Sequence, residues 1–306
     1  MTVAVAPEFM PRIRRGEPMK KHTSWHVGGP ADVFFNPRDR AELAAFLRTL
    51  GADVPIHWIG LGSNLLVRDG GIEGVVISTH GTLDRLERLS ETTVYVEAGV
   101  ACARIAKQCI KWGLGPAEFF AGIPGTMGGA LAMNAGAFGG ETWRHVVKVE
   151  TIDRHGREHT RCASEFKVAY RQVEMPAPDE WFVSATLEFE HKPGAHEAEV
   201  RELLARRKAS QPIGEWSCGS TFTNPPNDHA ARLIEAAGLK GFRIGDASVS
   251  LKHANFIINH GNATAADIEA LIEHVQGTVE RLHGVKLHPE VRMVGRKSEP
   301  KDDECV

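Results

Sequence analysis

A stretch of very small residues, Ala121–Glu141 (AGIPGTMGGALAMNAGAFGGE), constrains the fold more than any other part of the chain. It contains seven glycines and five alanines but a single charged residue. A segment with so little side-chain volume cannot fill a core, and its glycines leave backbone N–H and C=O groups open to close approach. Pro124 and the two Gly-Gly pairs exclude one long helix. Its larger apolar residues distinguish it from a polar Gly/Ser linker: Ile123, Met127, Leu131, Met133 and Phe138. Because buried backbone polar groups need partners, the stretch predicts a cradle for a large polar ligand.

Composition limits the class of protein. A chain of 306 residues with 42% hydrophobic and 25% charged residues is typical of a globular protein of two or three domains. A formal net charge of −3 gives no electrostatic reason to expect nucleic acid or an anionic membrane as a partner. The five cysteines form no CxxC pair, so the sequence predicts neither a disulfide scaffold nor a zinc site.

No targeting or membrane signal is evident in the sequence. The N-terminus places its arginines after a short apolar start, which is the wrong order for a signal peptide. No later segment is apolar enough to predict a transmembrane helix. These patterns predict a cytoplasmic protein without a membrane partner, and we expect a monomer.

Periodicity indicates an α+β protein. Helices are expected over 38–50, 101–114, 196–208, 230–237 and 264–282, and Ser164 is a candidate cap for a helix in 164–171. Strands are expected over 57–59, 75–78, 93–97, 146–152, 181–190, 254–259 and 291–294. Thr264 and Asp267 have the spacing of a capping box. We expect a boundary between the strand-rich part and a separate αβ segment near 195–210.

A second glycine-rich loop follows the strand expected at 57–59. Gly60-Leu61-Gly62-Ser63-Asn64 lacks the third glycine and the following helix of a dinucleotide fingerprint. It still offers several N–H groups and two polar side chains in one tight bend, which suits an anion. His22 and His26 stand four residues apart, but Gly28-Gly29-Pro30 makes a helix there improbable, so no metal site is predicted.

Several motifs together resemble the bacterial UDP-N-acetylenolpyruvoylglucosamine reductases. They are TSWHVGGPAD at 23–32, GLGSNLLVRDGG at 60–71, the stretch at 121–141, CGSTFTNP at 218–225, HANFIINHGNATAADIEALI at 253–272 and HPEVRMVG at 288–295. The resemblance spans nearly the whole chain. The length of the chain is similar to that of the shorter type of this family, which lacks an extra substrate-binding insertion.

The resemblance implies an FAD-binding domain of the vanillyl-alcohol-oxidase type, made of two α/β subdomains, and a C-terminal α/β substrate-binding domain. The expected division is 1–85 and 86–200 for the two subdomains and 201–298 for the substrate domain, with a disordered tail at 299–306. FAD would be held non-covalently, and NADPH would be the reductant. The residues that match cofactor-binding positions are Gly60, Gly62, Ser63, Asn64, Leu65, Gly122, Ile123, Pro124, Gly125, Thr126, Gly129, Asn134, Gly136 and Arg292.

The resemblance also implies a reaction. UDP-N-acetylglucosamine enolpyruvate would be reduced to UDP-N-acetylmuramate in peptidoglycan precursor synthesis, with NADPH and substrate bound in turn. Ser220 matches the family's proton donor, and Arg171 and Glu290 match the pair that flanks the substrate carboxylate. Arginine can fork onto that carboxylate, whereas Glu290 suits a developing anion only when burial keeps it protonated. Tyr170, Lys208 and Asn224 match substrate-binding positions.

The match is incomplete at two positions, and two other functions stay open. His26 stands where the family commonly has arginine, which predicts weaker or pH-dependent binding of the cofactor, and Val173 replaces a common serine near Arg171.

One alternative function is that of another flavin oxidase of the same fold, acting on an alcohol or lactone. The other is a non-catalytic flavin- or nucleotide-binding module. A Ser-His-Asp hydrolase is excluded because the chain has no GxSxG motif.

Overall fold

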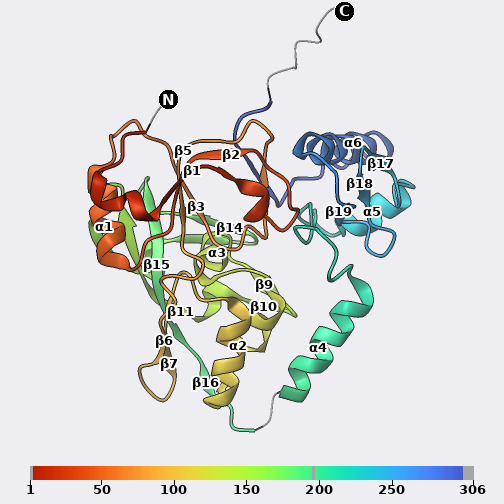
Figure 1. Cartoon of the computed structure of the whole chain (residues 1–306). Coiled ribbons are helices and arrows are strands. Elements are labelled where there is room, and N and C mark those ends of the chain that lie inside the picture. The colour runs from red at the N-terminus through yellow and green to blue at the C-terminus, as the bar shows by residue number, and fades with distance from the viewer. Residues whose placement is uncertain (1–2, 195–196, 299–306) are drawn as a thin grey trace, which may run out of the picture.

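The structure is a computed structural model that describes residues 3–194 and 197–298. Figure 1 shows three parts: two sheet-containing parts stacked one above the other, and a smaller part beside the upper one that contains most of the C-terminal third of the chain. The described chain thus has the α+β character that the periodicity predicted.

The first sheet has the strand order β1-β2-β5-β3. Its strands are β1 (Ile13–Pro18), β2 (Pro30–Phe35), β3 (Ile56–Ile59) and β5 (Ile72–Ser78). β2 and β3 both run parallel to β5, and β1 is antiparallel to β2. Helix α1 (Arg40–Thr49) begins at Asp39, whose side chain accepts from the Glu42 N–H at 2.8 Å. Its apolar face, with Leu43, Phe46 and Leu47, is fully buried in this core.

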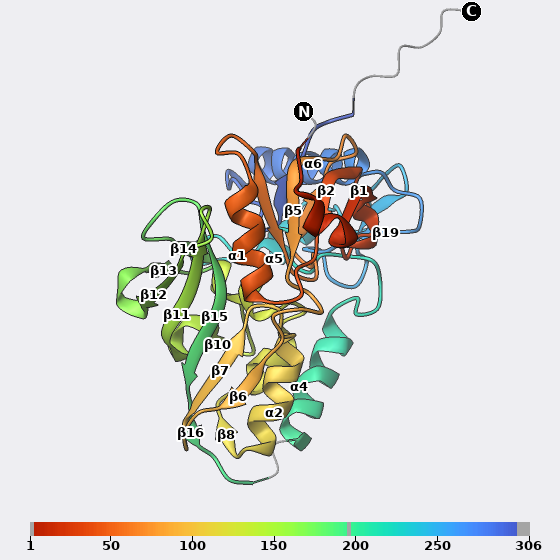
Figure 2. The same ribbon diagram turned by 60° about the vertical axis from the view of Figure 1, so that its left-hand side comes forward.

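The second sheet is antiparallel throughout and has the order β12-β11-β15-β7-β6. Its strands are β6 (Leu86–Arg88), β7 (Thr93–Glu97), β11 (Val146–Asp153), β12 (Glu158–Cys162) and β15 (Glu180–Glu188). Helix α2 (Cys102–Lys111) lies against this part (Figure 2). Cys102 and Cys109 are buried in its core, where a free cysteine behaves as a small apolar side chain.

The glycine-rich stretch folds as a chain of short pieces rather than one helix. They are a 3-10 helix over Glu118–Gly122, α3 (Met127–Ala132), β9 (Gly136–Ala137) and β10 (Gly140–Glu141). Two further short strands, β8 (Leu114–Gly115) and β16 (Glu190–His191), pair nearby. Other 3-10 turns cover Pro7–Arg12, Met19–Lys21, Thr142–His145 and Ala163–Glu165. The prediction that glycine pairs exclude a long helix is confirmed.

The expectation of a helix capped by Ser164 is wrong. Ser164 lies inside the 3-10 turn Ala163–Glu165, which Cys162 precedes as the N-cap. The chain then forms a hairpin from β13 (Lys167–Ala169) and β14 (Gln172–Glu174). The few apolar residues of this short segment fit a helical periodicity and a strand periodicity equally well. The two-residue turn at Tyr170-Arg171, with Arg171 at φ +57°, favours the hairpin.

The last third of the chain supplies α4 (Glu197–Ser210) and a compact αβ unit. That unit contains α5 (Ala230–Ala236), the antiparallel strands β17 (Arg243–Ile244), β18 (Ala247–Val249) and β19 (Ile257–Asn259), and α6 (Ala265–His283). The capping box of Thr264 and Asp267 is confirmed, and α6 ends at Gly284 in the left-handed conformation with φ 66°. Strand β20 (Arg292–Val294) then leaves the unit and runs parallel to β4 (Leu65–Val67).

Several bonds fix the C-terminal unit to the part of the chain that contains the first sheet. The Trp25 indole N–H donates to the Ile257 carbonyl at 2.8 Å, and the Asn259 amide donates to the Trp25 carbonyl at 2.8 Å. Arg68 forms a two-pronged ion pair with Glu269 on α6. The Asp69 carboxylate accepts from two N–H groups in the first turn of α6. These two parts therefore form one packed body, with Trp25 and Leu66 in the same apolar cluster as α6.

None of the helices in 3–194 and 197–298 is both long enough and apolar enough to cross a membrane. The division at residues 85 and 200 stays a proposal, and the tail at 299–306 lies outside the described residues. The pairing of β20 with β4 joins residues on both sides of that division.

Candidate functional site

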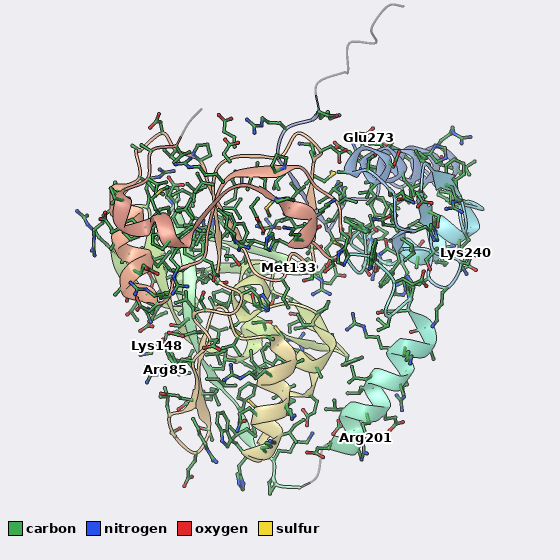
Figure 3. All side chains as sticks on the ribbon, in the orientation of Figure 1. Arg85, Met133, Lys148, Arg201, Lys240 and Glu273 are labelled. Carbon is green, nitrogen blue, oxygen red and sulfur yellow. The ribbon has the colours of Figure 1, made fainter. Side chains whose placement is uncertain are left out.

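Three neighbouring cavities share lining residues where the parts of the molecule meet. The central cavity, about 470 Å³, is lined by the glycine-rich stretch, α4, the Cys218–Ser220 loop, Arg171 and Glu290. The inter-sheet cavity, about 440 Å³, lies between β3 and β15. The linking cavity, about 150 Å³, shares residues with both. Met133 lines the central and linking cavities, and its label in Figure 3 marks this junction in the middle of the molecule.

The two glycine-rich loops predicted to hold a cofactor face each other across the linking cavity. All the residues predicted for cofactor binding line one of the three cavities, except Asn134. Asn134 is buried and its side chain is used within the fold: its amide donates to Ala169 and Glu141, and its carbonyl oxygen accepts from the Trp143 N–H. Its part in the site is therefore to hold the cradle in shape.

The cradle fits a ligand that approaches the backbone closely. A Cβ on Gly129 would have only the Thr126 hydroxyl oxygen near it, at 4.0 Å, so this side of α3 faces open space. A Cβ added to Gly60 would lie 2.4 Å from the Thr126 hydroxyl oxygen. The first glycine loop therefore packs directly against Thr126 of the glycine-rich stretch, with no room for a side chain at position 60. The Thr126 hydroxyl is buried without a hydrogen-bond partner and lines both the inter-sheet and linking cavities. An orphaned hydroxyl beside open backbone fits a large polar cofactor such as FAD.

Two stacked indoles form one wall of the inter-sheet cavity, and the sequence analysis missed both. Trp58 from β3 lies 5.4 Å, centroid to centroid, from Trp181 of β15. The Trp58 indole N–H is buried and has no hydrogen-bond partner. An aromatic wall with a free donor suits the flat, acceptor-rich end of a dinucleotide. The sequence signal at Trp58 was a tryptophan two residues before a glycine loop, which is weak because tryptophan is also common in cores.

Arg171, Glu290 and Ser220 meet at the central cavity although they come from three separate segments. Arg171 stands at the tip of the β13–β14 hairpin, where its guanidinium donates to the Gly136 carbonyl at 3.1 Å. Glu290 precedes β20, and its own carbonyl accepts from the Asn64 amide at 3.0 Å. Ser220 follows Gly219, whose φ of +72° allows the tight turn.

Asn255 fixes the Ser220 loop from behind, and the sequence analysis did not identify it. Its side-chain oxygen accepts from the Phe222 N–H at 2.9 Å, and its amide donates to the Phe222 carbonyl at 2.8 Å. Its backbone carbonyl accepts from the Thr221 N–H at 2.8 Å. The Glu290 N–H in turn donates to the Thr221 carbonyl at 2.8 Å, so Ser220 and Glu290 are set relative to each other by backbone.

The electrostatics of this trio favour a neutral glutamic acid. Burial raises the pKa of Glu290, and the nearby Arg171 opposes that rise only in part. The Arg171 Nε atom lies 3.3 Å from a Glu290 carboxyl oxygen, but its N–H is not aligned for a hydrogen bond and has no other partner. The site therefore offers a guanidinium N–H without a hydrogen-bond partner beside a carboxyl group whose pKa is raised by burial.

The residues predicted for substrate binding do not line the described cavities. Tyr170 is exposed, and the Arg171 guanidinium lies 5.6 Å from its ring centre. The Asn224 side chain accepts from the Ala230 N–H and so holds the start of α5. Lys208 is exposed near the end of α4, while its neighbours Arg206 and Arg207 line the central cavity instead. His26 is likewise outside the cavities and packs against Trp216 with the rings tilted and their centres 4.4 Å apart.

Comparison with known proteins agrees with this geometry. The family model described as UDP-N-acetylenolpyruvoylglucosamine reductase, C-terminal domain, matches residues 211–294, and a model for an FAD binding domain matches residues 31–161. The UDP-N-acetylenolpyruvoylglucosamine reductase of Alkalilimnicola ehrlichii is 60% identical over 286 residues, covering 92% of this chain and 95% of the relative. This chain belongs to the UDP-N-acetylenolpyruvoylglucosamine reductase family.

Other UDP-N-acetylenolpyruvoylglucosamine reductases agree with that assignment. The enzyme of Methylococcus capsulatus is 56% identical over 280 residues, with 91% of this chain and 92% of the relative covered. The crystal structure of the reductase from Thermus caldophilus superposes with a TM-score of 0.78 at 31% identity and covers 95% of this chain and 99% of that one. The family and the α+β fold with an FAD-binding domain, both predicted from the sequence, are confirmed.

Proposed function

We propose that this chain reduces UDP-N-acetylglucosamine enolpyruvate to UDP-N-acetylmuramate, with non-covalently bound FAD and with NADPH as reductant. The observation that carries the proposal is the meeting of Ser220, Arg171 and Glu290 in a cavity that the glycine cradle also lines. The inter-sheet and linking cavities would hold FAD, and the central cavity would take the two nucleotides in turn. The family relationship supports the same reaction.

When bound and reduced by NADPH, FAD would supply a hydride to the substrate carbon beta to the carboxylate. Negative charge then develops on the alpha carbon and spreads into the carboxylate, and this species is costly in water. The Arg171 guanidinium, which lines the cavity and has one unpartnered N–H, would bind that carboxylate with charge-assisted hydrogen bonds. A substrate carboxylate would thereby satisfy the N–H that lacks a partner.

Glu290 and Ser220 would act on the developing carbanion. A protonated Glu290, favoured by burial, donates a hydrogen bond to the substrate carboxylate where an ionised one would repel it. Ser220 would give its hydroxyl proton to the alpha carbon. A serine hydroxyl is a weak acid, but the carbanion is a far stronger base. Proton transfer therefore needs only that the Ser220 loop be held in place, which the hydrogen bonds of Asn255 to Phe222 provide.

An anaerobic turnover assay tests the proposal. The purified protein is expected to carry FAD and to oxidise more than one equivalent of NADPH only when the UDP-enolpyruvyl sugar is present, with the lactyl ether as product. Hydrogen peroxide formed from an alcohol or lactone in air would instead support the flavin oxidase alternative, which the comparisons do not favour. A flavin-loaded protein that never turns over would contradict both. Light scattering would test the expected monomer, and cell fractionation the expected cytoplasmic location.

A further inference from the structure

The hairpin that carries Arg171 is weakly packed against the rest of the protein. Among the side chains of β13 and β14 only Val173 is partly buried, where it packs against the apolar core of the second sheet. The other side chains of the two strands are exposed. A two-stranded hairpin is at best marginally stable on its own. The position of Arg171 therefore depends on the bonds that attach this hairpin to its surroundings.

Two hydrogen bonds make that attachment within the described residues, and both come from the segment 134–136. The Asn134 side-chain amide donates to the carbonyl of Ala169, two residues before Arg171, at 3.2 Å. The Gly136 carbonyl accepts from the Arg171 guanidinium at 3.1 Å. One short segment after α3 thus holds the backbone next to the arginine as well as its side chain.

Asn134 is itself held in a fixed orientation. It is buried, and its backbone has φ +46°, a left-handed conformation that asparagine adopts more readily than most residues. Its side-chain oxygen accepts from the Trp143 N–H at 3.1 Å, so its amide nitrogen faces the Ala169 carbonyl and the Glu141 carboxylate. Both ends of the side chain are therefore engaged within the protein.

We propose that Asn134 is a positioning residue for Arg171. By binding the Ala169 carbonyl, it holds the tip of the hairpin where the guanidinium reaches the substrate carboxylate; this role rests on the function proposed above. It differs from the cofactor-binding role that the sequence predicted for Asn134, because it affects only the half of the reaction that uses Arg171. NADPH has no carboxylate, so its reduction of FAD does not need this arginine.

Asn134→Asp tests the bond to the hairpin. The new side chain has nearly the same size and still accepts from the Trp143 N–H, but an ionised carboxylate cannot donate to the Ala169 carbonyl. We expect the FAD-loaded variant to be reduced by NADPH at the wild-type rate in stopped-flow absorbance. Oxidation of its reduced flavin by the UDP-enolpyruvyl sugar should be about ten- to hundredfold slower, because a misplacement of about 1 Å can cost about a hundredfold in rate.

A second variant and a matched control separate this effect from that of the introduced charge. Asn134→Gly removes the side chain without adding charge and keeps the left-handed backbone unstrained, so it should slow the same half of the reaction. Asn227→Asp makes the same change at an exposed asparagine that also has a left-handed backbone, φ +60°, and lines none of the three cavities. Asn227→Asp should behave as the wild type in both halves.

A double-mutant cycle tests whether Asn134 acts through Arg171. Calorimetry of the UDP-enolpyruvyl sugar with the oxidised, FAD-loaded protein should show weaker binding to Asn134→Asp than to the wild type. In an Arg171→Ala background the same substitution should cause no further loss, because the group through which it acts is gone. Hydrogen exchange of residues 167–174 should be faster in Asn134→Asp, and this readout needs no turnover. A wild type that never reduces the sugar, with that faster exchange present, would therefore contradict only the proposed function.

Four results would overturn the positioning role. The first is an unchanged rate of flavin oxidation by the sugar in both Asn134 variants. The second is equal slowing of the two half-reactions, which would indicate a general structural role. The third is an equal loss of sugar binding in the wild-type and Arg171→Ala backgrounds. The fourth is failure of both Asn134 variants to fold or to retain FAD, which would assign the side chain to the fold as a whole or to the cofactor.

Discussion

The Nε atom of Arg171 lies 3.3 Å from the carboxyl group of Glu290, and the two residues reach this contact from different parts of the molecule. Arg171 comes from a hairpin next to the second sheet, whereas Glu290 precedes the strand that returns to β4. The pair therefore forms only when these parts pack together. Because the N–H is not aligned on the carboxyl oxygen, the contact leaves hydrogen-bonding capacity for a third group.

Ser220→Ala should separate the two halves of the reaction. We expect NADPH to reduce the bound flavin at the wild-type rate, whereas formation of the lactyl ether should fall by about a hundredfold to ten-thousandfold, the usual contribution of a general acid. Stopped-flow absorbance of the flavin measures each half separately. Ser217→Ala, three residues earlier in the same loop and outside the cavities, should behave as the wild type. Normal product formation by Ser220→Ala would remove Ser220 from the proton-donor role.

Glu290 should determine the alkaline limb of the pH profile. Since burial raises its pKa, the protonated form persists above the pH at which an exposed glutamate ionises, and activity should fall as pH rises through that raised pKa. The stability that the folded state gains from holding this proton is lost in the same direction. In Glu290→Gln the side chain cannot ionise, so we expect a lower rate without that limb. An unchanged limb in Glu290→Gln would assign the titration to another group.

Gly129→Ala should weaken FAD binding without harming the fold. Gly129 lies in α3 with no neighbour closer than 4.0 Å to its added Cβ, and alanine favours a helix over glycine by about 1 kcal/mol. The methyl group would project toward the linking and inter-sheet cavities, where overpacking typically costs about 1–3 kcal/mol. We therefore expect an equal or higher melting temperature for the apoprotein and at least about tenfold weaker FAD binding.

Gly277→Ala is the control for Gly129→Ala. Gly277 is an exposed glycine of α6, and its Cβ would also meet nothing within 4 Å. It should gain similar helix stability while FAD titrations stay unchanged. Equal FAD affinity in both variants would show that the cofactor does not approach α3.

The Arg68–Glu269 pair should make the attachment of the C-terminal unit sensitive to acid. The hydrogen bonds from Arg68 hold the pKa of Glu269 below its usual value. A lowered folded-state pKa gives stability that is present above the unfolded pKa, near 4.3, and is lost as pH falls through the folded value. Arg68→Ala should cost about 1–3 kcal/mol at neutral pH and reduce the acid dependence of unfolding. Denaturant unfolding from pH 7 to pH 3 measures the free energy of unfolding of the wild type and of Arg68→Ala. The same pH dependence of that free energy in the two proteins would contradict this role.

Local patterns predicted many of the elements because their signals lie within a few residues. The helical spacing of Leu43, Phe46 and Leu47 and the capping box at Thr264 each specify their own segment. Strands β1 and β2 were not predicted. The edge strand β1 contains three charged residues and a glycine, so its sequence has no apolar alternation to detect. Its position is set by pairing with β2, which is a tertiary effect.

The site was predictable to the extent that motifs specify it. The glycine loops show their chemistry in the sequence, since only bare backbone lets a large ligand approach so closely. Trp58 and Asn255 act through neighbours distant in sequence, and nothing in their immediate surroundings distinguishes them from ordinary core or surface residues. The roles of Ser220, Arg171 and Glu290 came from the family resemblance, and they stay predictions until variants are measured.

The pairing of β20 with β4 has a consequence for engineering the protein. Residues 292–294 complete a ladder whose other strand lies more than two hundred positions earlier, directly after the first glycine loop. A chimera that exchanges the C-terminal third between family members would replace one strand of that ladder and the adjoining Glu290 together. Such exchanges should succeed only when the donor segment retains complementary partners for Leu65 and Val67, so these two remote pieces of the gene are expected to evolve as a unit.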